Sequence, residues 1–185
     1  MIFISGGVRS GKSTFAEKLA IRTAKKINGK LHYIATGVAM DDEMKQRIAR
    51  HQRERENSML RWKTWEKQTE IETIASSFQK DDVILLDCMT TLLNNELFSE
   101  QRDWDPHFLE EVFTRVIKGI EAIERECGYL ILVSNEVFHE LNYESELVFH
   151  YSRVLGNLHQ IIVKKADSAY LVEASIPLLM KGAEI

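Results

Sequence analysis

The sequence predicts an α/β fold in which a mostly parallel sheet is flanked by helices. Short apolar runs typical of strands alternate with longer stretches whose apolar residues recur at helical spacing. Residues 83–86 are continuously apolar, as expected of a central strand that is buried on both faces. Because there are only two prolines and no linker rich in glycine or serine, we expect one domain over residues 1–185.

The first elements are expected to be a strand over residues 2–5, a helix over 13–27 and a strand over 31–35. The opening run Ile2-Phe3-Ile4 has no basic segment before it and is too short for a signal peptide, so it indicates a strand. A second helix is expected over residues 41–56. It begins with Asp41, Asp42 and Glu43, whose negative charges suit the positive end of a helix dipole.

Helical spacing predicts further helices over residues 65–78 and 106–126, with strands over 83–87 and 129–134. The segment 135–156 is expected to begin as a loop and to become helical by Glu144. A last strand is expected over residues 169–173. Strands that alternate with helices in this way are typical of a parallel sheet covered on both faces.

Composition and charge narrow the class of protein. The net charge is −4, with 44% apolar and 28% charged residues, so the chain has no general attraction to nucleic acid or anionic membrane. No apolar run approaches the roughly 18 residues that span a bilayer. We therefore expect a cytoplasmic protein with no nucleic-acid partner and no stable membrane insertion. Cys88 and Cys127 lack metal-ligand spacing and are expected to be buried thiols.

The segment after the first strand carries the strongest motif. Gly6-Gly7-Val8-Arg9-Ser10-Gly11-Lys12-Ser13 matches G-x-x-x-x-G-K-[ST] between an expected strand and an expected helix, as that motif requires. Its glycines allow backbone N–H groups to point inward, and the helix adds its positive dipole end. We expect these residues to bind a nucleoside triphosphate, with Lys12 on the β- and γ-phosphates and Ser13 on Mg²⁺. The fold class is therefore P-loop NTPase-like.

A carboxylate is expected beside the phosphate loop, because a P-loop protein needs an acid at the end of a neighbouring strand to hold the Mg²⁺ water shell. Asp87 closes the apolar run 83–86 and suits this role. The alternative is that Asp87 caps the N-terminus of a following helix. We favour the metal role.

His51 lies on a helix face that is rich in arginine. Met44, Ile48 and His51 are spaced i, i+4 and i+7 and share one face. Four arginines crowd the same stretch: Arg47, Arg50, Arg53 and Arg55. From spacing alone, His51 is an edge-of-core residue and the arginines form a solvated face. In a second interpretation, a neutral imidazole attacks a phosphorus atom and the arginines stabilise the developing charge.

The chain resembles the bifunctional adenosylcobinamide kinase / adenosylcobinamide-phosphate guanylyltransferase family of cobalamin assembly. The resemblance is carried by short segments that follow the family's order along nearly the whole chain. They are residues 4–13, 33–36, 41–44 with Arg47, Ile48 and His51, 62–66, 85–91 with Asn94 and Asn95, 134–137, Leu155-Gly156, Ala166-Asp167 and 176–178. The phosphate loop alone would be generic, whereas the whole set is specific.

The resemblance implies two reactions. His51 takes GMP from GTP as a histidyl–GMP intermediate and passes it to adenosylcobinamide phosphate, and a kinase reaction phosphorylates the aminopropanol hydroxyl of adenosylcobinamide. GTP or ATP with Mg²⁺, and a corrinoid substrate, are thus expected. Nucleotide contacts carried over by position are residues 6–13, Ala35, Thr36, Gly37, Gln52, Arg53, Glu54, Arg55, Glu66 and Asp87. Members of the family assemble as trimers, so a homo-oligomer is expected.

The chain departs from the family's pattern over residues 138–159, where a glycine-rich stretch is usual. This chain has residues 138–143 there, and Asn157 and His159 replace two usual residues. Two alternatives therefore stay open: a P-loop kinase that acts on another small hydroxyl compound, and a nucleotide-binding regulatory module. His51 in its arginine-rich helix argues against the regulatory module, since a switch needs no nucleophile.

Overall fold

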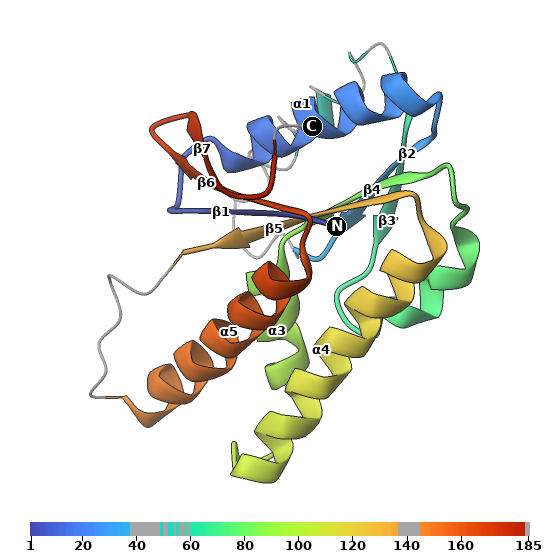
Figure 1. The fold of residues 1–185 in the computed structure, drawn as a ribbon. Coiled ribbons are helices and arrows are strands. Elements are labelled where there is room, and N and C mark those ends of the chain that lie inside the picture. The colour runs from blue at the N-terminus through green and yellow to red at the C-terminus, as the bar shows by residue number, and fades with distance from the viewer. Residues whose placement is uncertain are drawn as a thin grey trace.

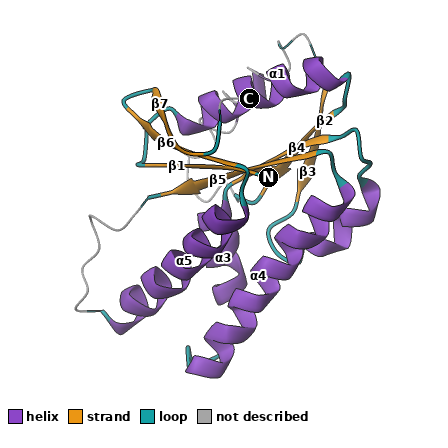
Figure 2. Cartoon of the chain, viewed as in Figure 1, coloured by secondary structure: helices purple, strands orange, loops and turns teal. Residues whose placement is uncertain are grey.

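The computed structural model describes residues 1–37, 49, 52–53, 55, 58, 60–136 and 145–183. Within them the chain forms a seven-stranded sheet with helices on both faces (Figures 1 and 2). The strands are β1 (Ile2–Gly6), β2 (Leu31–Ala35), β3 (Trp62–Glu66), β4 (Val83–Asp87), β5 (Tyr129–Asn135), β6 (Ser168–Glu173) and β7 (Ile176–Lys181). The helices are α1 (Lys12–Ile27), the 3₁₀ helix η1 (Ile71–Ser77), α3 (Met89–Phe98), α4 (Pro106–Glu126) and α5 (Glu146–Lys165).

The strand order is β3-β2-β4-β5-β1-β6-β7. Pairing is parallel from β3 to β6, and β7 alone among the described strands runs antiparallel to its neighbour β6. The P-loop NTPase-like fold class predicted from the sequence, with its mostly parallel sheet, is confirmed in this architecture. The five predicted strands are all present.

Alternation along the strands creates two cores. Ile2 and Ile4 of β1 pack with Leu19 on the face covered by α1. Phe3, between them, joins the larger core under α3, α4 and α5, which also contains Phe108 and Leu132. Figure 1 shows α1 above the sheet and the other three helices below it. Since β4 contributes buried residues to both cores, its continuous apolar run is explained.

Helix α4 begins at a capping motif that the sequence encodes locally. The carboxylate of Asp105 accepts a hydrogen bond from the backbone N–H of Phe108 at 2.8 Å, and Pro106 occupies the first turn. Helix α5 is capped at its C-terminus, where the Lys181 ammonium donates to the carbonyl oxygens of Val163 and Ala166. The two caps satisfy backbone groups at the N-terminus of α4 and at the C-terminus of α5.

Three parts of the fold differ from the sequence prediction. The helix expected over residues 65–78 is wrong: β3 takes the first residues, and η1 follows. Trp62, Thr64 and Trp65 suit a pleated edge strand, and pairing with β2 outweighs the helical spacing. The sequence also did not predict α3 or β7. Most of the helix expected over residues 41–56 lies outside the described residues, of which 49, 52–53 and 55 are helical.

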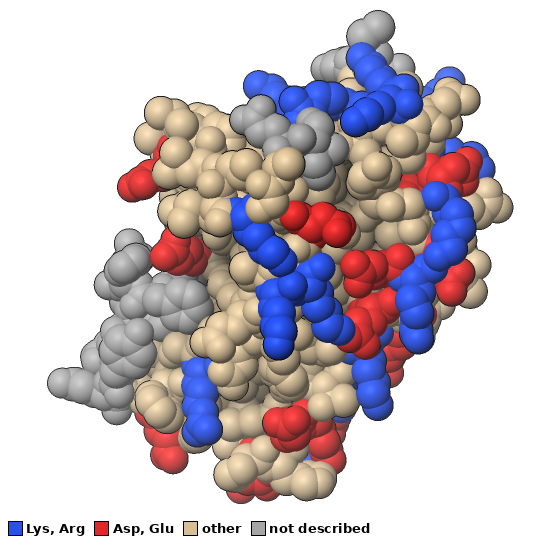
Figure 3. Space-filling model, in the orientation of Figure 1, with Lys and Arg blue, Asp and Glu red and all other residues tan. Residues whose placement is uncertain are grey.

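Both cysteines are buried free thiols, as predicted. Burial raises the pKa of Cys127 to about 12, so this thiol is protonated at neutral pH. No helix among the described residues is long and apolar enough to cross a membrane. On the face shown in Figure 3, basic and acidic side chains are interspersed, with basic residues gathered over α1.

Candidate active site

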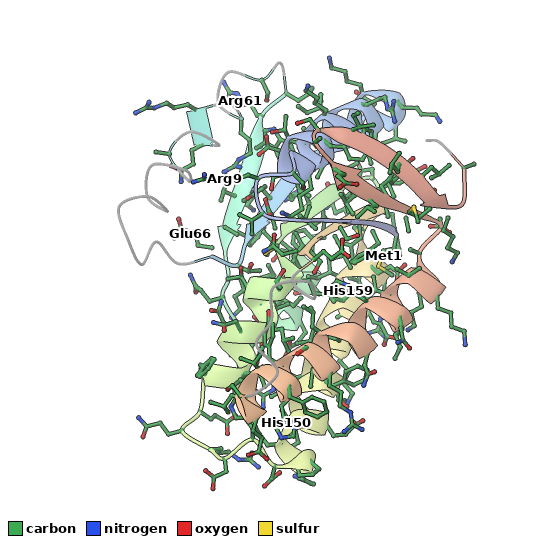
Figure 4. All side chains as sticks on the ribbon, turned by 90° about the vertical axis from the view of Figure 1, so that its left-hand side faces the viewer. Met1, Arg9, Arg61, Glu66, His150 and His159 are labelled. Carbon is green, nitrogen blue, oxygen red and sulfur yellow. The ribbon has the colours of Figure 1, made fainter. Side chains whose placement is uncertain are left out.

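The carboxyl ends of the parallel strands meet at one edge of the sheet. Strand register places Gly6 beside Asn135, and Ala35 beside both Glu66 and Asp87. In open α/β sheets, ligands bind outside this edge. Figure 4 looks onto it and shows Arg9 and Glu66 on this side of the molecule. The fold therefore brings together most of the residues that the sequence predicted for the nucleotide site.

The phosphate loop connects β1 to α1 as predicted. Arg9 and Gly11 adopt left-handed conformations, with φ of 61° and 90°, and Gly11 is the N-cap of α1. The first turn of α1 contains no acidic residue, so no carboxylate of its own neutralises the positive end of the helix dipole. The positive end of the α1 dipole therefore lies at the phosphate loop.

Lys12 and Ser13 begin α1 and are nearly buried, at 3% and 6% exposure. The Lys12 ammonium donates a hydrogen bond to the carbonyl oxygen of Gly7 at 3.0 Å, so its charge lies over the loop. A buried ammonium is costly without an anionic or polar partner. The Gly7 carbonyl oxygen is one such polar partner.

The phosphate loop packs directly against the β6–β7 hairpin, a contact that the sequence did not reveal. The backbone N–H of Ser175 donates to the carbonyl oxygen of Ser10 at 2.8 Å. A Cβ on Gly6 would lie 2.4 Å from the carbonyl oxygen of Val172, and a Cβ on Gly11 would lie 2.6 Å from the Ser175 hydroxyl. Close approach of the hairpin therefore requires a glycine at both positions, and at Gly11 the left-handed conformation requires it as well.

Asp87 is the last residue of β4 and is half-buried. The sequence placed it on a strand neighbouring the phosphate loop, and this adjacency is wrong, because β5 lies between β4 and β1. The residue at the N-cap of α3 is Cys88, so the alternative role of Asp87 as a helix cap is also not observed. The Tyr33 hydroxyl donates to Oδ2 of Asp87 at 3.2 Å.

Thr36 fixes the ends of β2 and β4 to each other. Its hydroxyl donates to the carbonyl oxygen of Cys88 and accepts the Cys88 N–H, both at 2.8 Å. Its own carbonyl oxygen accepts a hydrogen bond from the Asn95 side chain at 2.8 Å. Thr36 is fully buried, whereas Ala35 and Gly37 on either side are half-buried. The predicted contact residues at the end of β2 and just after it thus differ in exposure.

Arg55 is buried, unlike the exposed Gln52 and Arg53. Its guanidinium lies 3.0 Å from the carboxylate of Glu17 on α1, and its Cζ lies 3.7 Å from the centroid of the Tyr33 ring. His51 and Glu54 lie outside the described residues. The structure therefore attaches the end of the predicted arginine-rich helix to α1 and β2.

A polar network at the end of β5 received no role from the sequence. The Thr90 hydroxyl accepts the Asn135 backbone N–H at 2.8 Å, and Ser134 Oγ lies 2.8 Å from Nε2 of His159. Burial lowers the pKa of His159 to about 4. The Glu136 N–H donates to the Gly6 carbonyl oxygen at 3.0 Å and joins this network to the phosphate loop. The sequence signal that could have predicted this network is the pair of polar residues, Ser134 and Asn135, at the end of the buried strand β5.

The model of one protein family, described as cobinamide kinase / cobinamide phosphate guanyltransferase, matches residues 2–180. The chain is similar to the bifunctional adenosylcobalamin biosynthesis protein CobU of Salmonella typhimurium, with 34% identity over 188 residues, 98% of this chain and 99% of that protein. The protein of the same name from Escherichia coli is 32% identical over the same extent. CobP of Pseudomonas aeruginosa is 33% identical over 180 residues, 97% of this chain and 96% of that protein.

Solved structures share the fold at low sequence identity. The flagellar accessory protein FlaH of Methanocaldococcus jannaschii has a TM-score of 0.50 at 14% identity, over 98% of this chain and 77% of that chain. A KaiC-like protein of Pyrococcus horikoshii has a TM-score of 0.50 at 13% identity, over 99% and 79%. A solved ATPase domain reaches 0.51 at 13% identity, over 92% and 68%. These likenesses concern the fold alone.

Proposed function

Because the chain belongs to the cobinamide kinase / cobinamide phosphate guanyltransferase family, we propose that it carries out both reactions of that name. The kinase and nucleotidyltransferase activities of this family are steps in cobalamin biosynthesis. The observation that carries the proposal is the burial of Lys12 and Ser13 at the start of α1, with Asp87 at the same edge of the sheet. Because its nucleotide substrates are cytoplasmic, we propose that compartment for the protein.

In the kinase reaction, the hydroxyl of adenosylcobinamide attacks the γ-phosphorus of GTP or ATP. A new P–O bond forms, the hydroxyl proton passes to solvent, the bond to the bridging oxygen breaks, and the nucleoside diphosphate leaves with the electron pair. The loop N–H groups and the Lys12 ammonium stabilise charge on the phosphate oxygens. This reaction needs no covalent intermediate with the protein.

The residues fit a Mg²⁺ ion. The Ser13 hydroxyl and the Asp87 carboxylate are hard oxygen donors, and Mg²⁺ binds through one or two such groups together with phosphates and water. In the described part of the chain, no three His, Cys, Asp or Glu residues gather to form an all-protein metal cage. When bound, the ion would neutralise charge on the β- and γ-phosphates.

In the guanylyl transfer, we assign the nucleophile to His51. Its imidazole nitrogen attacks the α-phosphorus of GTP, a P–N bond forms, and pyrophosphate leaves. A phosphate oxygen of adenosylcobinamide phosphate then attacks the same phosphorus and displaces the imidazole. The support for His51 is its position in the family's pattern and its place four residues before Arg55, which is anchored on Glu17.

The remaining nucleotide contacts are proposed by position. Gln52 and Arg53 are exposed and can reach a ligand, and Glu66 is exposed at the carboxyl end of β3. Thr36 has its hydroxyl engaged with Cys88, so it contributes by fixing the chain between Ala35 and Gly37. The full proposed set is residues 6–13, Ala35, Thr36, Gly37, Gln52, Arg53, Glu54, Arg55, Glu66 and Asp87.

We also propose that the protein assembles as a homo-oligomer, with three copies as in the family's pattern. The support is β7, one of the two edge strands of the described sheet, whose apolar side chains are exposed: Ile176 at 61%, Leu178 at 45%, Leu179 at 39% and Met180 at 66%. A long apolar edge strand favours association. Replacing Ile176 and Met180 with lysine should yield monomers in sedimentation velocity experiments. Oligomers of unchanged size would show that the interface does not involve β7.

The kinase assignment is tested by incubating the protein with adenosylcobinamide and with ATP or GTP labelled at the γ-phosphorus. We expect label on the corrinoid, with transfer abolished by EDTA and restored by excess Mg²⁺. Competition between the two nucleotides identifies the preferred donor. Label that stays on nucleotide and inorganic phosphate with both donors would contradict the kinase reaction.

A further inference from the structure

Tyr33 connects the proposed metal carboxylate to a buried ion pair. It lies in β2 with its side chain on the α1 face of the sheet and is 8% exposed. Its hydroxyl donates to Oδ2 of Asp87 at 3.2 Å. The proposed reactions assign no role to this residue. The contact is specific to one carboxylate oxygen, so it fixes the rotation of the carboxylate plane.

Arg55 covers the face of the tyrosine ring. The guanidinium carbon lies 3.7 Å from the ring centroid, and Nη1 lies 3.0 Å from Oε1 of Glu17. Arg55 and Glu17 are 6% and 7% exposed, so the ion pair is fixed in a low-dielectric environment. A cation over the ring face attracts the π electrons and fixes the ring in place.

This arrangement leaves the second oxygen of Asp87 for a ligand. Among the described residues, Oδ2 accepts a hydrogen bond from the Tyr33 hydroxyl, whereas no side chain donates a hydrogen bond to Oδ1. An unrestrained carboxylate at a strand end would rotate, and ordering it on binding would cost conformational entropy. A carboxylate that is already fixed avoids this cost, as supporting residues around metal sites generally do.

We infer that Tyr33 is a positioning residue for the metal carboxylate: it holds Asp87 so that Oδ1 faces the metal-bound water. Arg55 supports it by holding the ring through contact with its face. The inference rests on the metal role proposed for Asp87. Tyr33 itself contacts neither nucleotide nor metal in this arrangement.

The experiment measures Mn²⁺ binding by electron paramagnetic resonance, in which free Mn²⁺ gives the signal that disappears on binding. The protein is saturated with a GTP analogue that cannot be hydrolysed. Wild type is compared with Tyr33→Phe, Asp87→Asn and the double variant. Tyr170→Phe is the matched control, because Tyr170 is also buried on the α1 face but has its ring against Phe15.

Loss of a hydrogen bond to a charged acceptor should raise the Mn²⁺ dissociation constant of Tyr33→Phe by about fivefold to tenfold. Asp87→Asn should raise it at least as much, and adding Tyr33→Phe to that variant should raise it no further. Tyr170→Phe should bind Mn²⁺ like the wild type. Thermal unfolding of each variant checks that the fold is intact.

Two failures are distinguishable. Wild-type Mn²⁺ affinity in Tyr33→Phe, with weakened binding in Asp87→Asn, overturns the positioning role and leaves the metal role of Asp87 in place. Wild-type affinity in Asp87→Asn overturns the metal role and the positioning role together. An increase that is additive in the double variant also overturns the inference, because Tyr33 would then act independently of Asp87.

Discussion

The backbone N–H of Ser175 donates to the carbonyl oxygen of Ser10 at 2.8 Å, so the turn of the β6–β7 hairpin is tied to the phosphate loop. The two turn residues, Ala174 and Ser175, have φ of 48° and 66°, as a tight hairpin turn requires. The same hairpin ends in the exposed apolar strand β7. The phosphate loop is therefore supported by the element proposed to contact a second subunit.

Gly11→Ala should weaken nucleotide binding by at least about tenfold. The φ of 90° disfavours a side chain, and the new Cβ would lie 2.6 Å from the Ser175 hydroxyl, so the loop must move. Isothermal titration with GTP and Mg²⁺ measures the effect. Adding Ser175→Gly, which removes the hydroxyl and keeps the N–H, should recover part of the affinity. No loss in Gly11→Ala would show that the hairpin contact does not constrain the loop.

Lys12→Ala should lose most GTP affinity and turnover, because its ammonium stabilises charge on the transferred phosphate. Lys18→Ala, at an exposed position of the same helix, is the control and should retain both. Equilibrium binding and the γ-phosphoryl transfer assay measure the two quantities. If Lys12→Ala kept the same GTP affinity and turnover as Lys18→Ala, the triphosphate would not bind at this loop.

Arg55→Met should destabilise the fold by roughly 3 kcal/mol, because it removes the guanidinium that pairs with the buried Glu17 carboxylate. Replacing both residues, as Arg55→Met with Glu17→Met, should restore most of the lost stability. Urea unfolding gives the free energies. If Arg55→Met loses less free energy of unfolding than the double variant, Arg55 and Glu17 do not stabilise each other in the fold.

Stability should fall as the pH is lowered from 6.5 to about 4, in part because of His159. Burial lowers its pKa from 6.5 to about 4, so across this window the unfolded chain binds a proton that the folded chain does not. At 1.36 kcal/mol per pKa unit, the loss amounts to at most about 3 kcal/mol. His159→Gln keeps a polar group near Ser134 and does not titrate.

The difference between wild type and His159→Gln isolates this contribution, because burial also lowers the pKa of His32 in both proteins. Urea unfolding at several pH values should show a flatter pH dependence for His159→Gln. Parallel curves for the two proteins would mean that His159 titrates alike in the folded and unfolded chains.

Sequence patterns predicted the elements whose signals are local. Five strands, α1 and α4 follow from apolar periodicity, and the phosphate loop follows from a motif with fixed spacing. Strand β7 was missed, although Pro177 near its start suits an edge strand. Its pairing with β6 becomes visible only once the tight turn at Ala174 and Ser175 is known.

The supporting contacts of the site could not be predicted in this way. Tyr33 and Asp87 are 54 positions apart in the sequence, and Arg55 and Glu17 are 38 apart. Contacts between such distant side chains have no spacing signature, since they depend on strand order and on which face each residue takes. For the same reason, the insertion of β5 between β4 and β1 was not foreseen.

The central claim, guanylyl transfer through His51, is tested by incubating the protein with Mg²⁺ and GTP labelled at the α-phosphorus, followed by denaturing electrophoresis. We predict a covalent GMP adduct that survives base and is lost in mild acid, as a P–N bond to imidazole requires. It should be absent from His51→Ala, which should still phosphorylate adenosylcobinamide, and present in His107→Ala, a control at an exposed position. A wild-type protein that binds GTP and stays unlabelled would contradict the claim.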